Sequence, residues 1–117
     1  MRRFVALFAA LGLLAAAGGS YAEDLTDGKT LFANNCQRCH GAKGQGGVGK
    51  KLAGDAAYWD FPIFKRTVMT GIDDEGKQMK TMPVFGKVGL TKPKGAILTD
   101  AQLADIQAYL KTFGPPE

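Results

Sequence analysis

The sequence predicts an all-α fold of one small domain, and three observations support this prediction. Three segments, 26–35, 60–71 and 99–113, combine helix-starting residues with apolar side chains at helical spacing. No segment shows the alternation of apolar and polar residues that is typical of a half-buried strand, and no internal repeat occurs. The length of 117 residues limits the chain to a single domain.

Residues 1–22 have the pattern of a secretory signal peptide and take no part in the fold prediction. Two arginines precede the uncharged, mainly apolar stretch Phe4–Ala17, and small residues follow at the two positions that a signal peptidase reads. This pattern predicts cleavage after Ala22. A helix over the apolar stretch would rise about 21 Å, which is short of the roughly 30 Å hydrocarbon core of a bilayer. We therefore expect a mature domain, residues 23–117, that has no membrane span.

The charge of the chain does not indicate a nucleic-acid partner. The whole sequence carries a formal net charge of +4, but two of its 15 basic side chains belong to the expected leader. The mature domain therefore carries 13 basic and 11 acidic side chains, a net charge of +2. No patch of basic residues with interleaved aromatic residues is present. We expect no nucleic-acid binding.

The first helix of the mature domain is expected over 26–35. Thr26 or Asp27 can cap its start, and Leu31 and Phe32 supply its apolar side. The helix leads directly into a compact motif of two cysteines and a histidine.

The motif Cys36-Gln37-Arg38-Cys39-His40 uses both cysteines and the only histidine of the chain. Two thiols three positions apart can each add across one vinyl group of a haem, and the histidine can offer a ring nitrogen to the iron. A thioredoxin-like redox pair would need a preceding strand, and a zinc site would need a fourth ligand. A chance match is the remaining alternative. The motif therefore predicts one covalently attached haem c, bound through Cys36 and Cys39, with His40 as an axial iron ligand.

The next part of the chain is expected to form a loop and then a second helix. Residues 41–54 include six glycines and three lysines without helical periodicity, and glycine lets backbone approach a flat cofactor closely. The second helix is expected to have Asp60 as its N-cap and Pro62 in its first turn. It should stop at Gly71 and be followed by an acidic turn, 72–76.

The C-terminal helix has the clearest helix signals of the chain. Thr99 and Gln102 match a capping box at its start. Its apolar face is expected to carry Leu103, Ile106, Leu110 and Phe113. The preceding segment, 86–98, is expected to be irregular.

The sixth coordination position of the iron requires a second ligand. A second histidine is excluded because the chain has only one, which leaves a methionine thioether, a lysine amine or an open site. Met69 lies in the middle of the second predicted helix, where core filling is the better interpretation. Met82 precedes Pro83, which favours an extended backbone and suits a ligand that projects from a loop. We therefore predict Met82 as the second axial ligand, with Met79 as the alternative.

With these residues the mature chain resembles the class I c-type cytochromes over nearly its whole length. Gly28 and Phe32 resemble the residues with which the family's first helix crosses its last, where Ile106 and Tyr109 resemble their partners. The segment 82–86 resembles the family's Met-Pro-x-Phe segment. Class II cytochromes, in contrast, carry the attachment motif near the C-terminus. The resemblance implies a small cytochrome c fold of three to four helices around one covalently attached haem.

The segment 49–54 is similar to the family's Gly-Pro-x-Leu-x-Gly loop, but Lys50 stands in the place of the proline. In the family, the backbone carbonyl of that proline accepts the proton from the other ring nitrogen of the ligating histidine. The resemblance implies that the Lys50 carbonyl does the same for His40, which would set the tautomer and orientation of the ring. A second departure is the segment 87–97, which is longer than the usual link in the family.

The resemblance implies an electron-transfer protein rather than an enzyme. We expect a monomeric periplasmic carrier that moves single electrons between a redox-protein donor and acceptor. A cytochrome subunit of a periplasmic dehydrogenase or of a sulfur-oxidising complex is the alternative. A ligand-binding sensor or a peroxidase is less favoured, because no histidine is left for a distal site. Three lysines, Lys87, Lys92 and Lys94, are expected either to form a docking rim for an acidic partner or to belong to a solvated loop.

Overall fold

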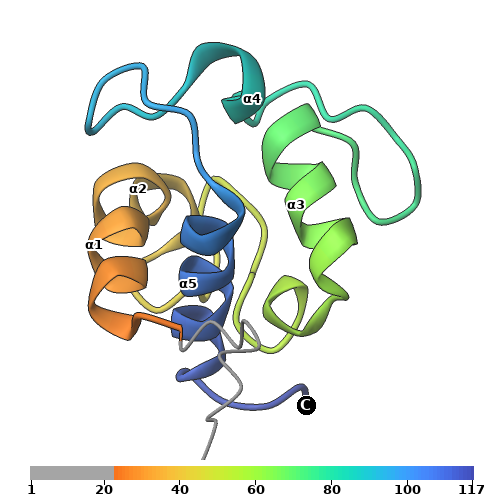
Figure 1. Cartoon of the computed structure of the whole chain (residues 1–117). Coiled ribbons are helices and arrows are strands. Elements are labelled where there is room, and N and C mark those ends of the chain that lie inside the picture. The colour runs from red at the N-terminus through yellow and green to blue at the C-terminus, as the bar shows by residue number, and fades with distance from the viewer. Residues whose placement is uncertain (1–22) are drawn as a thin grey trace, which may run out of the picture.

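The computed structural model describes residues 23–117, and these residues form a helical domain without a strand (Figure 1). The elements in chain order are α1 (Leu25–Asn35), α2 (Gln37–His40), the short 3₁₀-helix η1 (Ala56–Tyr58), α3 (Phe61–Thr70), α4 (Phe85–Val88) and α5 (Asp100–Lys111). The all-α prediction is confirmed. None of the helices in the described part of the chain is long and apolar enough to cross a membrane. The predicted signal peptide, residues 1–22, lies outside the described residues.

Helix α1 begins earlier than predicted because a different residue caps it. The side chain of Asp24 accepts a hydrogen bond from the backbone N–H of Asp27 at 3.0 Å, so the helix starts at Leu25. The prediction of Thr26 or Asp27 as the cap is therefore wrong, since both residues lie inside the first turn. The backbone N–H of Asp24 also donates to Oδ1 of Asp105 at 2.8 Å, which connects the start of α1 to the middle of α5.

The crossing of α1 and α5 organises the domain, and Gly28 allows it. A Cβ atom on Gly28 would lie 2.6 Å from the carbonyl carbon of Asp105 and closer still to its oxygen, so only glycine lets the two backbones meet. Beside this contact the rings of Phe32 and Tyr109 pack with centroids 5.9 Å apart. A hydrogen bond to the Asp105 carboxyl raises the pKa of Asp27 at the same crossing. The predicted pairing of the first and last helices is confirmed.

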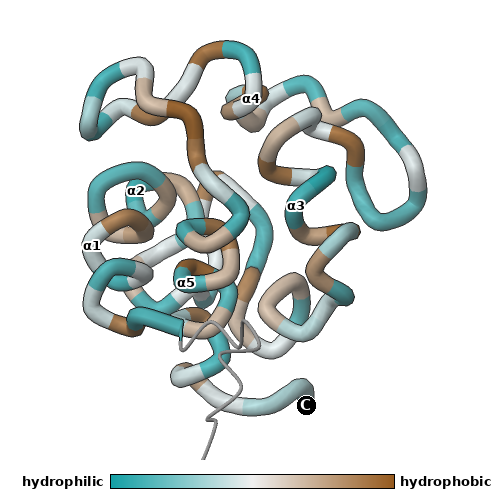
Figure 2. Tube along the Cα trace, in the orientation of Figure 1, coloured by the Kyte–Doolittle hydropathy of each residue, from teal (hydrophilic) through white to brown (hydrophobic). Residues whose placement is uncertain are grey.

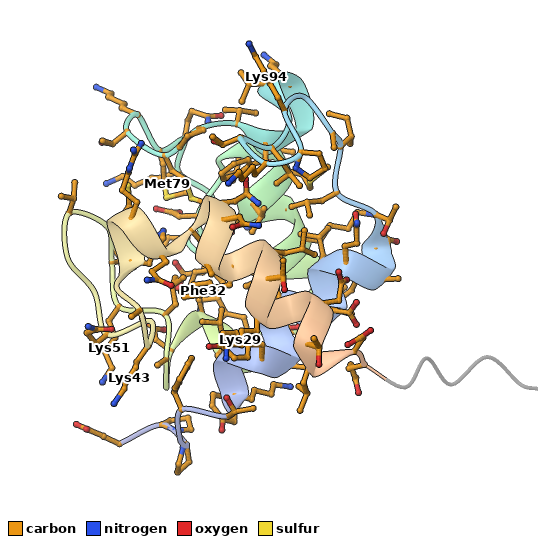
Figure 3. All side chains as sticks on the ribbon, turned by 90° about the vertical axis from the view of Figure 1, so that its left-hand side faces the viewer. Lys29, Phe32, Lys43, Lys51, Met79 and Lys94 are labelled. Atoms are coloured by element: carbon orange, nitrogen blue, oxygen red, sulfur yellow. The ribbon has the colours of Figure 1, made fainter. Side chains whose placement is uncertain are left out.

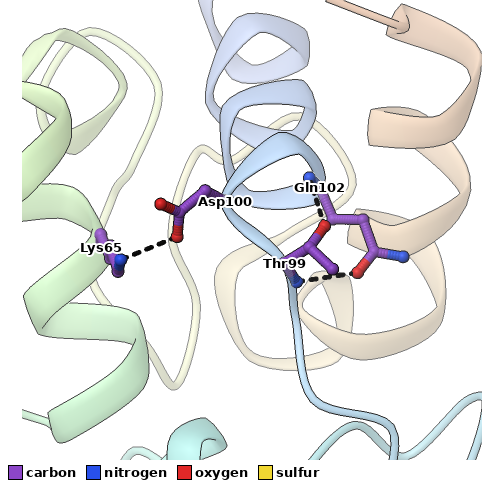
Figure 4. Close-up of polar contacts among 4 residues, drawn as sticks. All are labelled: Lys65, Thr99, Asp100 and Gln102. Atoms are coloured by element: carbon purple, nitrogen blue, oxygen red, sulfur yellow. Dashed lines mark hydrogen bonds and ion pairs between the residues drawn. The ribbon is translucent and has the colours of Figure 1, made fainter.

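Helix α5 starts with the predicted capping box (Figure 4). Oγ1 of Thr99 accepts from the N–H of Gln102 at 3.2 Å, and the Gln102 side chain accepts from the N–H of Thr99 at 3.0 Å. An ion pair of 2.8 Å joins Asp100 to Lys65 on α3, and because these side chains are 66% and 45% exposed it contributes only about 0.2–1 kcal/mol. The predicted apolar face is buried at Leu103, Ile106 and Leu110, whereas Phe113 lies beyond the end of the helix.

Helix α3 has the predicted ends but not the predicted N-terminal hydrogen bond. Asp60 is the N-cap residue and Pro62 lies in the first turn, yet the Asp60 side chain makes no capping bond. Gly71 ends the helix with a left-handed φ of 76°, which is a conformation that glycine adopts without strain. Helix α4 packs closely against the end of α3, since a Cβ on Gly86 would lie 3.3 Å from the carbonyl carbon of Met69.

The segment 86–98 is more ordered than predicted. It contributes most of α4, and the turn that follows is bound by one side chain from the last residue of α1. Asn35 donates to the carbonyl of Lys92 at 2.9 Å and accepts from the N–H groups of Thr91 and Lys92 at 2.9 and 3.0 Å. The apolar run 96–98 then descends from this turn to the start of α5 (Figure 2). The prediction of an irregular segment missed both the helix and this attachment.

The helices form two groups with a space between them. Helix α1 packs on α5, and α3 packs on α4, while α3 and α5 have a smaller contact. Figure 1 shows α1, α2 and α5 on the left and in the centre, α3 on the right and α4 above them. Buried apolar side chains of both groups face the space between them, among them Phe32, Phe64, Phe85 and Leu110.

Candidate functional site

A cavity of about 590 Å³ lies between the two groups of helices. Its walls are mainly apolar and include Phe32, Leu52, Phe64, Val68, Phe85, Leu98, Ile106 and Leu110. Small-molecule and cofactor sites have volumes of this order and walls of this kind. The wall also includes His40 and four sulfur-bearing residues, Cys36, Cys39, Met79 and Met82, which the sequence singled out.

The motif residues reach the cavity from a single helical turn. Cys36 ends α1, and the backbone N–H groups of Cys39 and His40 both donate to its carbonyl, at 3.2 and 3.0 Å. Residues three apart on a helical turn lie on one face, and both thiols line the cavity. Burial raises the pKa of the Cys36 thiol to about 12, and the neighbouring Cys39 adds to the shift. Cys36 is therefore a neutral thiol at neutral pH, whereas Cys39 is exposed at the edge of the cavity.

The ring of His40 is buried and oriented by the glycine-rich loop. Its Nδ1 lies 2.7 Å from the carbonyl oxygen of Lys50, which is a hydrogen-bond distance. A neutral ring that donates its Nδ1 proton to this carbonyl keeps the lone pair of Nε2 free for a metal ion. A Cβ on Gly49 would lie 2.8 Å from Cε1 of His40, so glycine is needed beside the ring.

Lysine in the place of proline does not leave the loop without support. The N–H of Gly49 donates to the carbonyl of Cys39 at 2.7 Å, and the N–H of Gly46 donates to that of His40 at 2.8 Å. Two backbone hydrogen bonds therefore join the loop to the motif within the four residues that precede the lysine. The Lys50 side chain is exposed, so its backbone carbonyl faces His40 without burying the ammonium group.

Two methionines line the cavity, and a third does not. Met79 and Met82 are half-buried and belong to the loop between α3 and α4. Met69, on α3, packs against the hydrophobic core and is not among the residues of the cavity wall. The prediction that Met69 fills the core is confirmed. The cavity wall therefore includes the sulfur-bearing residues Met79 and Met82 as well as the ring of His40.

The sequence analysis missed three residues around this site. Arg38 and Lys80 are exposed residues that line the cavity. Each is the neighbour in sequence of a predicted site residue, Cys39 or Met79, and this position was the sequence signal for them. Asn35 also lines the cavity while it binds the turn after α4, and no sequence signal distinguished it. The predicted rim lysines, Lys87, Lys92 and Lys94, are exposed but are not part of the cavity wall.

The fold and the cavity define a small helical domain that can hold one flat, apolar cofactor through two thiols and a histidine. A model of the cytochrome c family matches residues 25–114. The chain therefore belongs to the cytochrome c family, and it has the features of a class I c-type cytochrome. Its cofactor is a covalently bound haem c, in agreement with the thiols of Cys36 and Cys39 at an apolar cavity.

Two bacterial proteins resemble this chain over part of their length. Subunit FixP of a cbb3-type cytochrome c oxidase from Azorhizobium caulinodans is 33% identical over 93 residues, covering 74% of this chain and 28% of the relative. Subunit CcoP of a cbb3-type cytochrome c oxidase from an Azospirillum species is 36% identical over 95 residues, covering 74% and 29%. The chain thus spans less than a third of the length of these two relatives.

A solved structure of cytochrome CL from the marine methylotrophic bacterium Methylophaga aminisulfidivorans has the same fold. The two superpose with a TM-score of 0.50 and 21% sequence identity, over 75% of this chain and 53% of the other. This likeness agrees with the cytochrome c fold of the helices described above.

Proposed function

We propose that this protein is a periplasmic electron carrier whose haem iron alternates between the ferric and ferrous states. Cys36 and Cys39 would hold the haem, while His40 and Met82 would be the axial ligands. The observation that carries the proposal is that His40 and Met82, which lie 42 positions apart in the sequence, line one apolar cavity. A cytochrome c domain implies electron transfer.

The residues of the cavity would keep the iron six-coordinate and away from water. The bound haem supplies the one-electron chemistry. The Lys50 carbonyl would hold the His40 ring in one orientation, and the thioether of Met82 would offer a neutral ligand that disfavours the ferric state. Apolar walls would disfavour the extra positive charge of ferric iron further, so both features would raise the reduction potential.

The periplasmic location rests on the N-terminal segment and on the chemistry of attachment. Residues 1–22 have the pattern of a secretory signal peptide that would be cleaved after Ala22, which would leave 23–117 as the mature domain. Thioether-linked haem is assembled on the far side of the energy-transducing membrane. Detection of a mature N-terminus at Glu23 by mass spectrometry would test the cleavage site, and an intact leader on the haem-loaded protein would contradict it.

The test of the electron-carrier function is the optical spectrum of the reduced holoprotein with and without carbon monoxide. We expect no change, because a strong protein ligand in the sixth position leaves no open site on the iron. Ready binding of carbon monoxide by the wild-type protein would contradict the carrier proposal. It would favour a ligand-binding sensor or a peroxidase instead.

Basic side chains at the cavity support a proposal about the redox partner. Three exposed basic residues line the cavity from different segments, namely Arg38, Lys50 and Lys80. The carboxylate of Asp73, which also lines the cavity, accepts hydrogen bonds from backbone N–H groups of its own turn. Positive charge beside the cavity would attract an acidic patch on a donor or acceptor, mainly by raising the association rate. This set of cations, rather than the lysines of 86–98, would then be the docking rim.

Small charged probes can measure this rim directly. Oxidation of the reduced protein by the anion hexacyanoferrate(III) should slow by about tenfold at low ionic strength when Arg38, Lys50 and Lys80 are all replaced by glutamine. The matched control replaces Lys87, Lys92 and Lys94 by glutamine, and we expect a smaller effect there. High salt should remove the difference between the variants. Equal rates for the two triple variants at low ionic strength would contradict the proposed rim.

A permanent subunit is the second candidate function, and two observations favour it. The relatives FixP and CcoP are named as oxidase subunits, and they are longer than this chain. Val48 and Val88, which line the cavity, are 87% and 63% exposed, so some apolar surface is exposed at the site. A lasting interface would bury such surface. Co-purification of a stoichiometric partner from native membranes or periplasm would favour the subunit, and a monomer in gel filtration would favour the free carrier.

A further inference from the structure

The loop between α3 and α4 brings a second thioether to the haem cavity, and this thioether has no role in the proposed function. We propose that Met79 is a reserve axial ligand, which binds the iron in the sixth position when Met82 leaves it. The proposal rests on the proposed function, because it takes His40 and Met82 as the usual ligands. It adds a second coordination state that uses another residue of the same loop.

Burial distinguishes the two methionines from the rest of their segment. All the residues from 79 to 83 line the cavity, but only Met79 and Met82 among them are half-buried, whereas Lys80, Thr81 and Pro83 are exposed. In Figure 3, Met79 points in among the other side chains, while Lys94 points away from the body of the molecule. Methionine is long, unbranched and flexible, so its sulfur can reach different points of one cavity. Both thioethers are therefore available to the same space.

The backbone of the loop is attached on one side and free on the other. The N–H of Met79 donates to the carbonyl of Gly71 at 2.7 Å, and Ile72 and Gln78 form an isolated antiparallel bridge just before it. Within residues 23–117, no backbone hydrogen bond is donated by the amides of 80–82. Met79 is thus held at the end of α3, while Met82 belongs to a stretch that can move without breaking such bonds.

This arrangement allows the two sulfurs to exchange over a short path. Three residues span at most about 11 Å even when fully extended, so a shift of 80–82 that withdraws the Met82 sulfur leaves the Met79 side chain nearby, at the wall of the same cavity. The anchored Met79 does not have to move with the segment that carries Met82. The iron would then stay six-coordinate with a thioether ligand in both states of the loop.

Four variants of the holoprotein test the proposal, namely Met82→Ala, Met79→Ala, the double variant Met79→Ala/Met82→Ala, and the control Met69→Ala/Met82→Ala. The control removes a methionine that lies outside the cavity wall. Two readouts are needed: the near-infrared band of a thioether bound to ferric iron, and carbon monoxide binding to the reduced protein. Both are normalised to the haem absorbance, so a lower yield of folded protein does not change the result.

We expect Met82→Ala to keep the thioether band, and the double variant to lose it. If Met79 occupies the sixth position in Met82→Ala for about nine-tenths of the time, only about a tenth of this variant is open to carbon monoxide. Carbon monoxide should then bind to Met82→Ala about tenfold more weakly than to the double variant. The control should behave like Met82→Ala, and Met79→Ala should resemble the wild type.

Three results would overturn the proposal. The first is equal carbon monoxide binding by Met82→Ala and the double variant. The second is a nitrogen ligand in Met82→Ala, which would point to Lys80 in the same cavity wall. The third is loss of the band in Met79→Ala alone, because Met79 would then be the usual ligand. A wild-type protein that lacks the band and binds carbon monoxide would instead contradict the proposed function itself.

Discussion

Alanine in place of Gly28 should lower the free energy of unfolding by about 3 kcal/mol, at the upper end of the usual cost of overpacking. The added Cβ would lie 2.6 Å from the carbonyl carbon of Asp105, so the clash is with the backbone of α5 and not with a side chain that can turn away. Helix propensity acts in the opposite direction, since alanine is favoured over glycine in a helix by about 1 kcal/mol. We expect the clash to prevail, because α1 and α5 cannot separate without losing the buried contacts of Phe32.

Chemical denaturation of the holoprotein measures this effect, with Thr30→Ala as the control. Thr30 lies on the exposed side of α1, where alanine should be neutral or slightly stabilising. If Gly28→Ala is as stable as the wild type, or gains stability as Thr30→Ala does, the close crossing of the two helices is not what constrains position 28.

Replacement of both Cys36 and Cys39 by serine, followed by extraction of haem, should abolish the cooperative unfolding of the domain. Removal of haem would leave a mainly apolar cavity of about 590 Å³ open to water, so the side chains of its wall would lose their packing partner. Small domains have a total stability of about 5–15 kcal/mol. The chain without haem should therefore not retain the arrangement of α3 and α4 around α5.

Far-ultraviolet circular dichroism and thermal unfolding are the measurements for this variant. We expect a lower helix content and a broad transition without a clear midpoint. Cys39→Ser is the control, because it keeps the thiol of the more buried Cys36 and the His40 ligand, and it should retain a cooperative transition when loaded with haem. A haem-free double variant with the helix content and the sharp transition of the wild type would show that the apolar side chains alone hold the fold.

The features that could be predicted from the sequence depend on residues close together in the chain. The capping box of Thr99 and Gln102 joins residues three apart, and the stop at Gly71 depends on the backbone freedom of one residue. The attachment motif needs two thiols and a histidine within five positions. Local rules of hydrogen bonding and helix geometry are sufficient for such features.

The wrong or incomplete predictions each involve a choice that these rules leave open. Helix α1 has three acceptable cap residues in the sequence, Asp24, Thr26 and Asp27. Asp24 is favoured because its backbone N–H also donates to Asp105, 81 positions away. Asn35 binds the backbone of residues 56 and 57 positions further on, so nothing near it in the sequence indicated the role. Asp60 occupies the predicted position without the predicted bond, because Pro62 and packing suffice to start α3.

The sequence by itself determined the class of the protein, which is a helical domain with one haem-attachment motif and one histidine. It also limited the methionines predicted as the second iron ligand to Met82 and Met79. Only the tertiary structure decided which groups share the haem cavity, namely that Met79 and Met82 both line it and Met69 does not, and that Arg38 and Lys80 border it. The physical reason is distance along the chain. Covalent motifs and caps act within one helical turn, whereas a cavity wall is assembled from segments whose relative positions follow from the close crossing of α1 and α5 at Gly28.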